Sequence, residues 1–416
     1  MRPANPAARA TLIAAALLAL GAAVSLGLAR FSYALLLPPM RDDLGWRYVT
    51  AGAMNTVNAA GYLIGALAMP WLLARCGAAR TLWLGSAAAA LLLAGHGLVR
   101  EDAALYALRL VTGVASAMVF VSGGVLAARL SLKTALGSGV TPGLVLGIYY
   151  GGTGLGIVAC ALVLPPILGL DVVGMGLVAS ARDWPQTWQL SWLALALLAA
   201  LATWGIARVR DEAVPPTSVA ARAAQPAQRG RAWRPFGYGL AGYFMFGLGY
   251  IGYMTFIVTL LREQQLGDTS IAAFYALLGA GVIASPWWWA GLLQRHHSGR
   301  PLATLNALLA VATLLPVLPV VGGHPVLVFA SGALFGAVFL SVVASTTALV
   351  RHNLPPVQWP AGISAFTVVF ALGQIVGPSL VGWLSDGPGG LRLGLAVSAG
   401  ALAVGAALAS RQRALG

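Results

Sequence analysis

Long apolar stretches alternate with short polar segments along the whole chain. An α-helix needs about 20 apolar residues to cross the hydrocarbon core of a bilayer, because each residue adds about 1.5 Å. Twelve stretches come close to or exceed that length, at residues 12–37, 49–73, 81–99, 103–128, 140–168, 188–207, 236–261, 271–293, 302–321, 326–350, 361–384 and 393–410. The pattern predicts an all-α membrane protein with 12 transmembrane helices.

The longest polar segment divides these stretches into two sets of six. It covers residues 208–235 and holds six arginines and four prolines, which is typical of a flexible linker near the lipid surface. The sets share a short similarity, because Gly27–Tyr33 and Gly247–Tyr253 are identical at three of seven positions. Duplicated halves around a central site are common in secondary transporters. We therefore expect pseudo-symmetric six-helix bundles over 1–207 and 236–416.

Composition excludes a soluble protein, and the distribution of charge predicts an orientation. Hydrophobic residues make up 59% of the chain and charged residues only 9%. With a cytoplasmic N-terminus, 17 of the 25 Lys and Arg residues fall on cytoplasmic segments, and nine of the 11 acidic residues fall on outer loops. This asymmetry follows the positive-inside rule. We therefore expect a multi-pass protein of the bacterial inner membrane with both termini cytoplasmic, whose net charge of +14 faces lipid rather than nucleic acid.

Two arginines lie inside the apolar stretches, whereas every acidic residue lies outside them. Arg30 and Arg109 fall at similar depth, roughly 10 Å below the outer surface. A charged side chain in this environment costs at least about 2.5 kcal/mol, so it needs a compensating role. Binding an anionic group of a substrate is one such role, since a guanidinium binds carboxylate or phosphate bidentately. The alternatives are that either arginine extends towards the membrane surface, or that Arg109 pairs structurally with backbone carbonyls.

Polar and aromatic residues form stripes on two of the predicted helices. Asn55, Asn58 and Tyr62 share one helix face, and the face that holds Tyr250 and Tyr253 also carries Tyr243 and Phe246. These stripes are either the lining of a mixed polar and aromatic pocket or partners in hydrogen bonds between helices. The predicted substrate-binding residues are Arg30, Tyr33, Asn55, Asn58, Arg109, Tyr149, Tyr250, Tyr253 and Gln374.

Several motifs resemble those of the major facilitator superfamily. Pro70–Arg80 is similar to its G-x-L-x-D-R-x-G-R loop, and Arg109–Ala117 is similar to its R-x-x-x-G-x-x-x-A pattern. The loop matches at Leu72, Arg75 and Gly77, whereas Ala74 replaces the family's Asp. Gly27–Tyr33 with the following Leu-Leu-Leu-Pro-Pro, together with Gly373–Pro378, resembles the bacterial YbfB/YjiJ-type branch.

The resemblance covers essentially the whole chain and implies a monomeric transporter that works by alternating access. It implies that the first and fourth spans line a central cavity, and that Arg75, Gly77 and Arg80 act in gating. Gly143, Gly152 and Gly156 match the spacing of the family's antiporter-associated glycine motif, although Ile157 stands where that motif has proline. Gly152 and Gly156 are therefore candidate conformational residues, or else simple packing positions.

The sequence contains no catalytic constellation, metal-ligand cluster or nucleotide-binding motif, so we expect neither an enzyme nor a bound cofactor. The predicted function is secondary transport of a small organic anion, such as a carboxylate. No acid is embedded in the predicted helices, which favours anion exchange, uniport or a proton carried by the substrate itself. Proton coupling through a loop-edge acid such as Asp42 is the alternative. The alternative function is an efflux antiporter for amphipathic or aromatic compounds. A membrane sensor or scaffold is a hypothesis of a different class, and it would usually need a soluble output domain.

Overall fold

A computed structural model describes residues 6–134, 140–171, 174–175, 184–210, 234–318, 324–355 and 358–415. This part of the chain is helical and contains 12 segments long and apolar enough to cross a membrane, as predicted. The N-terminal set comprises α1 (Pro6–Ala22), η1 (Ala23–Phe31), α2 (Tyr33–Leu44), α3 (Tyr48–Cys76), α4 (Ala78–His96), α5 (Asp102–Thr134), α6 (Pro142–Leu168) and α7 (Thr187–Ile206). The C-terminal set comprises η3 (Arg234–Phe236), α9 (Gly237–Glu263), α10 (Asp268–Arg295), α11 (Arg300–Leu314), η4 (Leu315–Val317), α12 (Pro325–Asn353), α13 (Trp359–Ser385) and α14 (Gly390–Ser410).

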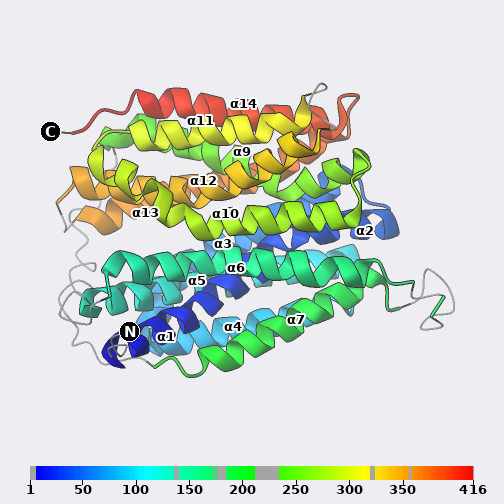
Figure 1. Ribbon diagram of the computed structural model, residues 1–416, viewed down its shortest axis with the longest axis horizontal. Helices are drawn as coiled ribbons and strands as arrows, with labels where there is room; N and C mark the ends of the chain where they lie inside the picture. Colours follow the sequence, from blue (N-terminus) through cyan, green and yellow to red (C-terminus); the bar gives the residue numbers. More distant parts are fainter. Residues whose placement is uncertain are drawn as a thin grey trace.

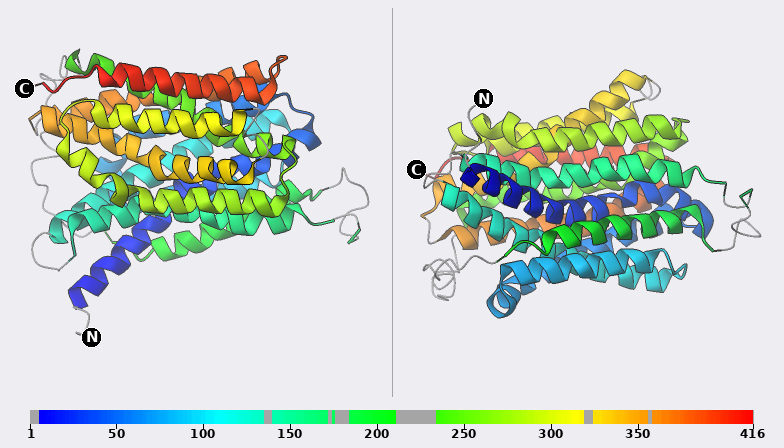
Figure 2. Two further views of the ribbon diagram at one scale, coloured as in Figure 1. Left: turned by 45° about the horizontal axis from the view of Figure 1, so that its top comes forward. Right: turned by 60° about the horizontal axis from the view of Figure 1, so that its bottom comes forward.

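The helices run along a common direction in two layers, with α1–α7 in one half of the molecule and α9–α14 in the other (Figure 1). Within the first half α5 packs against α3 and α4, and within the second α9 packs against α13 and α14. The halves meet most extensively along α6 with α10 and α3 with α13, and α2 also packs on α9. Two further views show the halves side by side (Figure 2). Most of the predicted linker, 208–235, lies outside the described residues.

Several helices extend beyond the apolar stretches predicted from the sequence. Asp42, Asp102 and Glu263 lie in terminal turns of α2, α5 and α9, so these helices carry acids at their ends. We call this end of the molecule the acidic end; it includes loops 45–47, 97–101, 264–267 and 386–389. The opposite end, with Arg75, Arg129, Arg295 and Arg351, is the basic end. The first and last described helices, α1 and α14, have their outer termini at the basic end (Figure 1).

The first membrane-spanning segment contains a π-helical stretch, η1, in its middle. The Ser32 amide donates to the Gly27 carbonyl at 3.0 Å, a bond that reaches back five residues instead of four. Gly27 also packs directly on α6, because a Cβ built there would lie 2.5 Å from the Gly156 Cα. π-Helical turns often occur at functional sites. This one ends immediately after Arg30 and positions that side chain.

Candidate functional site

Arg30 lies between the two halves of the protein and is only 3% exposed. Its Nη2 donates to Gln374 Oε1 on α13 at 3.0 Å, and its guanidinium carbon lies 5.6 Å from the centre of the Tyr62 ring on α3. Gln374 in turn donates through Nε2 to the Tyr250 hydroxyl on α9. The Arg30 Nε is buried and makes no hydrogen bond to any residue that the structure describes. Arg30 therefore keeps an unused donor where the halves meet.

Arg109 on α5 has very different surroundings and is 1% exposed. Nη1 donates to the Ala29 carbonyl at 3.2 Å, Nε to the Met54 carbonyl at 3.4 Å, and Nη2 to Asn55 Oδ1. The guanidinium also lies 4.6 Å from the centre of the Tyr33 ring. Its three nitrogens are thus used within the first half. This geometry favours the structural alternative for Arg109 over substrate contact.

The remaining predicted site residues divide into those near the boundary between the halves and those within one half. Asn55 Nδ2 donates across the boundary to Thr255 Oγ1 at 2.8 Å, and Gln374 and Tyr250 adjoin Arg30. Asn58 donates to the Arg109 carbonyl at 3.0 Å, and the Tyr33 hydroxyl donates to the Ala51 carbonyl at 2.9 Å.

Tyr149 and Tyr253 lie away from the Arg30 group. The Tyr149 hydroxyl donates to the Phe120 carbonyl at 2.5 Å, and the ring belongs to a separate core cluster with Leu18 and Leu82. The Tyr253 hydroxyl bonds to Ser331 at 2.7 Å. The structure therefore brings Arg30, Tyr250 and Gln374 together across the boundary, and Asn55 makes a separate contact across it. Tyr149 and Tyr253 satisfy their hydroxyls within one half.

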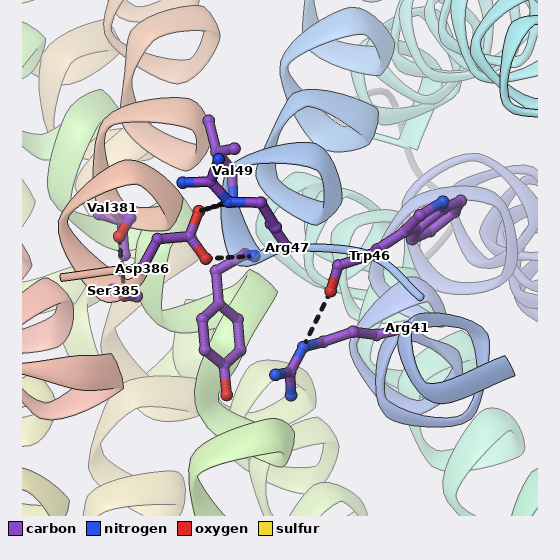
Figure 3. A network of polar contacts seen from close by, with 8 residues as sticks. Arg41, Trp46, Arg47, Val49, Val381, Ser385 and Asp386 are labelled. Atoms are coloured by element: carbon purple, nitrogen blue, oxygen red, sulfur yellow. Dashed lines mark hydrogen bonds and ion pairs between the residues drawn. The ribbon is translucent and has the colours of Figure 1, made fainter. Parts of the chain in front are cut away.

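Polar contacts join the two halves at the acidic end (Figure 3). The Asp386 carboxylate, just after α13, accepts from the backbone amides of Tyr48 at 2.8 Å and Val49 at 3.0 Å, and pairs with Arg47 at 3.5 Å. These amides open α3, so an acid from the second half caps a helix of the first. The Tyr48 hydroxyl also bonds to Glu263. We call Asp386 and the 47–49 segment the latch; sequence reasoning missed it because its parts lie 338 residues apart.

A family model described as "uncharacterised MFS-type transporter YbfB" matches residues 22–410, which is most of the chain. The chain belongs to this MFS-type transporter family. No curated protein sequence matches it significantly. The family assignment agrees with the predicted resemblance and identifies a membrane transporter rather than an enzyme.

Solved MFS transporters share the fold. A bacterial homologue of the human lysosomal transporter Spinster, in an inward-facing and unoccupied conformation, aligns with a TM-score of 0.67 and 15% identity over 97% of this chain and 96% of that chain. The nucleoside transporter NupG aligns with a TM-score of 0.66 and 15% identity over 97% of this chain and 98% of that chain. At this level of identity the comparison establishes the fold alone.

The predicted gating residues of this MFS-type transporter lie at the basic end. Gly77 joins α3 to α4 with φ +75°, a backbone conformation that favours glycine. Arg75 is exposed and lies over Trp71 of its own helix, 4.9 Å from the ring centre, and Arg80 is exposed on α4. The role of these residues in gating remains a prediction.

The glycines of α6 face two different neighbours. Gly152 and Gly156 pack on α1 and η1 within the first half, where added Cβ atoms would lie 2.1 Å from the Ala19 carbonyl oxygen and 2.6 Å from the Ala23 carbonyl oxygen. Gly154, which the motif did not include, faces the second half. A Cβ added there would lie 2.4 Å from the Gly279 carbonyl oxygen on α10. The close contact between α6 and α10 thus depends on Gly154.

Substituting Gly154 with alanine is expected to lower the thermal unfolding temperature in detergent. The methyl group would meet backbone, which cannot move aside as a side chain can, so α6 and α10 must separate. We expect a cost of about 1–3 kcal/mol. Gly143→Ala on the same helix is the control, because a Cβ there meets nothing within 4 Å. Equal unfolding temperatures for the two variants would contradict the packing argument.

Proposed function

We propose that this MFS-type transporter is a secondary transporter that carries a small organic anion, such as a carboxylate, across the bacterial inner membrane. The observation that supports the proposal is Arg30: a buried guanidinium between the halves, hydrogen bonded to a neutral amide, with Nε lacking a partner within the described part of the chain. A carboxylate with two oxygens matches Nε and a terminal nitrogen in the bidentate geometry that guanidinium groups favour. No cofactor is needed for this chemistry.

The proposed orientation places the basic end in the cytoplasm, because short cytoplasmic loops retain Lys and Arg. Both termini are then cytoplasmic, and residues 1–207 and 236–416 form two bundles joined by 208–235. The latch then closes the outer side. The structure in this interpretation represents a state closed to the outside. We propose a monomer as the working unit.

Binding at Arg30 would connect substrate occupancy to movement of the halves. An anion that takes the Arg30 donors displaces Gln374, so it removes one contact between η1 and α13 and substitutes its own. A ligand shifts the equilibrium between two conformations only through its different affinity for them, and this exchange of contacts supplies such a difference. Anion exchange, uniport and a proton carried by the substrate all fit this scheme. Asp42 is exposed at the acidic end, where it would have to act as a surface acid.

Transport by purified protein in liposomes tests the proposal. Small carboxylic acids are paired with their primary amides, which keep the shape and remove the charge. We expect transport or counterflow of at least one acid and not of its amide. Transport of acid and amide at equal rates would refute recognition of an anion. A rate unchanged by pH without proton movement would exclude coupling through Asp42.

The second candidate is efflux of amphipathic or aromatic compounds, which the aromatic side chains of the second half favour. Tyr243, Phe246 and Tyr250 on α9 stack with one another along the boundary. Efflux predicts broad binding of lipophilic compounds that does not depend on Arg30. A panel that includes lipophilic cations, compared between the unmodified protein and an Arg30 variant, separates the two functions.

Removing the latch is expected to shift the transporter towards a state open at the acidic end. Asp386→Ala deletes a helix cap and an ion pair, which together contribute about 1–2 kcal/mol. Spin labels at the exposed positions Leu98 and Leu393, in a Cys76→Ala background, report the separation of the halves by pulsed electron resonance. We expect a larger population at long distance.

The control for the latch is Asp268→Ala. Asp268 is also at the acidic end and pairs with Arg262 at 2.8 Å, but both residues belong to the second half. Its removal should leave the distance distribution unchanged. If Asp386→Ala and Asp268→Ala give the same distribution as the unmodified protein, the latch does not hold the halves together.

A further inference from the structure

Five aromatic rings with nearly parallel planes form a set that is connected to Arg30 through Tyr250 and Gln374. We call Tyr243, Phe246, Tyr250, Phe339 and Phe370 the aromatic wall; they come from α9, α12 and α13. Phe246 and Phe370 are inclined by 10°, Tyr250 and Phe370 by 18°, and Tyr250 and Phe339 by 9°. Ring centres in these pairs are 5.3, 5.6 and 6.1 Å apart. The rings of the wall therefore stack on one another with offset, nearly parallel planes.

Some other aromatic pairs meet edge-on instead. Phe31 meets Phe339 at 90°, and Phe274 meets Phe329 at 76°. In an edge-to-face contact the positive edge of one ring lies on the negative face of another. In an offset stack the planes are parallel, so another flat ring can stack on the outermost face. Phe370 is half-buried, while Phe246 and Tyr250 are buried. Phe370 is thus the member of the wall that an incoming ring can reach.

The wall is joined to Arg30 through one side chain. Gln374 accepts from Arg30 Nη2 through Oε1 and donates to the Tyr250 hydroxyl through Nε2. A single amide therefore spans the distance between the guanidinium and the aromatic wall. Phe370 precedes Gln374 by one helical turn on α13, so the part of a ligand attached to an anionic group at Arg30 would lie beside the Phe370 ring.

We infer that the substrate is an aromatic carboxylate, a planar ring that bears its acid group directly or on a short linker. This inference rests on the proposed function and deepens it. The carboxylate takes Arg30 Nε and a terminal nitrogen, and the ring stacks on Phe370, the member of the wall that is only half-buried. An alicyclic acid of the same size fills the same volume and makes the same hydrogen bonds, but it lacks the flat π face that complements these rings.

Binding of three matched compounds to the purified, full-length protein tests the inference. Benzoate is the reference compound. Cyclohexanecarboxylate differs from it in the aromaticity of the ring, and benzamide differs from it in charge. We expect benzoate to bind about fivefold more tightly than cyclohexanecarboxylate, because one stacked ring pair contributes a modest preference. Phe370→Leu should reduce that ratio to near one without changing affinity for cyclohexanecarboxylate. Titration calorimetry or thermal shift measures each affinity.

Phe329→Leu is the matched control. Phe329, on α12, is half-buried like Phe370, but it does not belong to the wall and meets Phe274 edge-on. It should preserve the preference for benzoate. Equal affinity for the two acids, lost for both when Arg30 is replaced, would overturn the aromatic inference and leave the proposed function standing. Benzamide binding as tightly as benzoate would overturn the proposed function itself. Failure of both ring acids to bind would overturn the aromatic inference, and the carboxylate panel would then decide the proposed function separately.

Discussion

Arg30→Gln is expected to weaken binding of the carboxylate substrate about a hundredfold while the protein remains folded. Each charge-assisted hydrogen bond contributes roughly 1.5–3 kcal/mol, so the loss of a bidentate pair amounts to about 3 kcal/mol, or a factor of about 100. Glutamine keeps most of the side-chain volume and removes a charge that is costly to bury. The unfolding temperature without ligand should therefore change little. Titration calorimetry and thermal unfolding of the same preparation measure both quantities.

Arg30→Lys separates charge from geometry. Lysine keeps the positive charge but lacks the planar fork, so binding should weaken about tenfold. Arg295→Ala at the basic end is a control for loss of positive charge, because Arg295 is exposed and belongs to neither the site nor the latch. Unchanged affinity in Arg30→Gln would show that Arg30 has a structural role and would favour the efflux alternative.

Arg109→Gln is expected to destabilise the fold by about 2–4 kcal/mol. Arg109 supplies hydrogen bonds to Ala29, Met54 and Asn55, which lie on the first and second membrane-spanning segments. Glutamine reaches at most one of these acceptors and leaves a void beside the others, and each lost bond costs about 1 kcal/mol in addition to the void. Unfolding in increasing concentrations of a denaturing detergent should show an earlier midpoint than for the unmodified protein.

Comparison of the same substitution at the two arginines provides the control. Arg30→Gln should bind ligand poorly and unfold normally, whereas Arg109→Gln should unfold early and, where it remains folded, still bind the ligand. A reversed result, in which Arg109→Gln is stable but does not bind, would assign substrate contact to Arg109. Measuring stability and affinity for both variants therefore distinguishes the two roles.

Some site features were predictable because local sequence determines them. Arg30 and Gln374 are polar residues inside apolar stretches, and burial of such residues has a cost that marks them as candidates. The stripe that carries Tyr243, Phe246 and Tyr250 follows from helical spacing. Phe339 and Phe370 gave no comparable signal, because a phenylalanine in an apolar helix is equally expected to face lipid. Ring orientation decides their candidacy, and it depends on packing between helices.

The sequence by itself determined that the chain is a 12-helix membrane transporter, because the length and apolar content of each span and the family motifs are local features of continuous sequence. Only the tertiary structure distinguished Arg30, with its unused Nε, from Arg109, whose nitrogens are satisfied. It also decided that Gly154 rather than Gly156 faces the other half, and that Asp386 caps α3. The physical reason is that hydrophobic length is a property of each helix, whereas hydrogen-bond satisfaction and close approach depend on residues hundreds of positions apart.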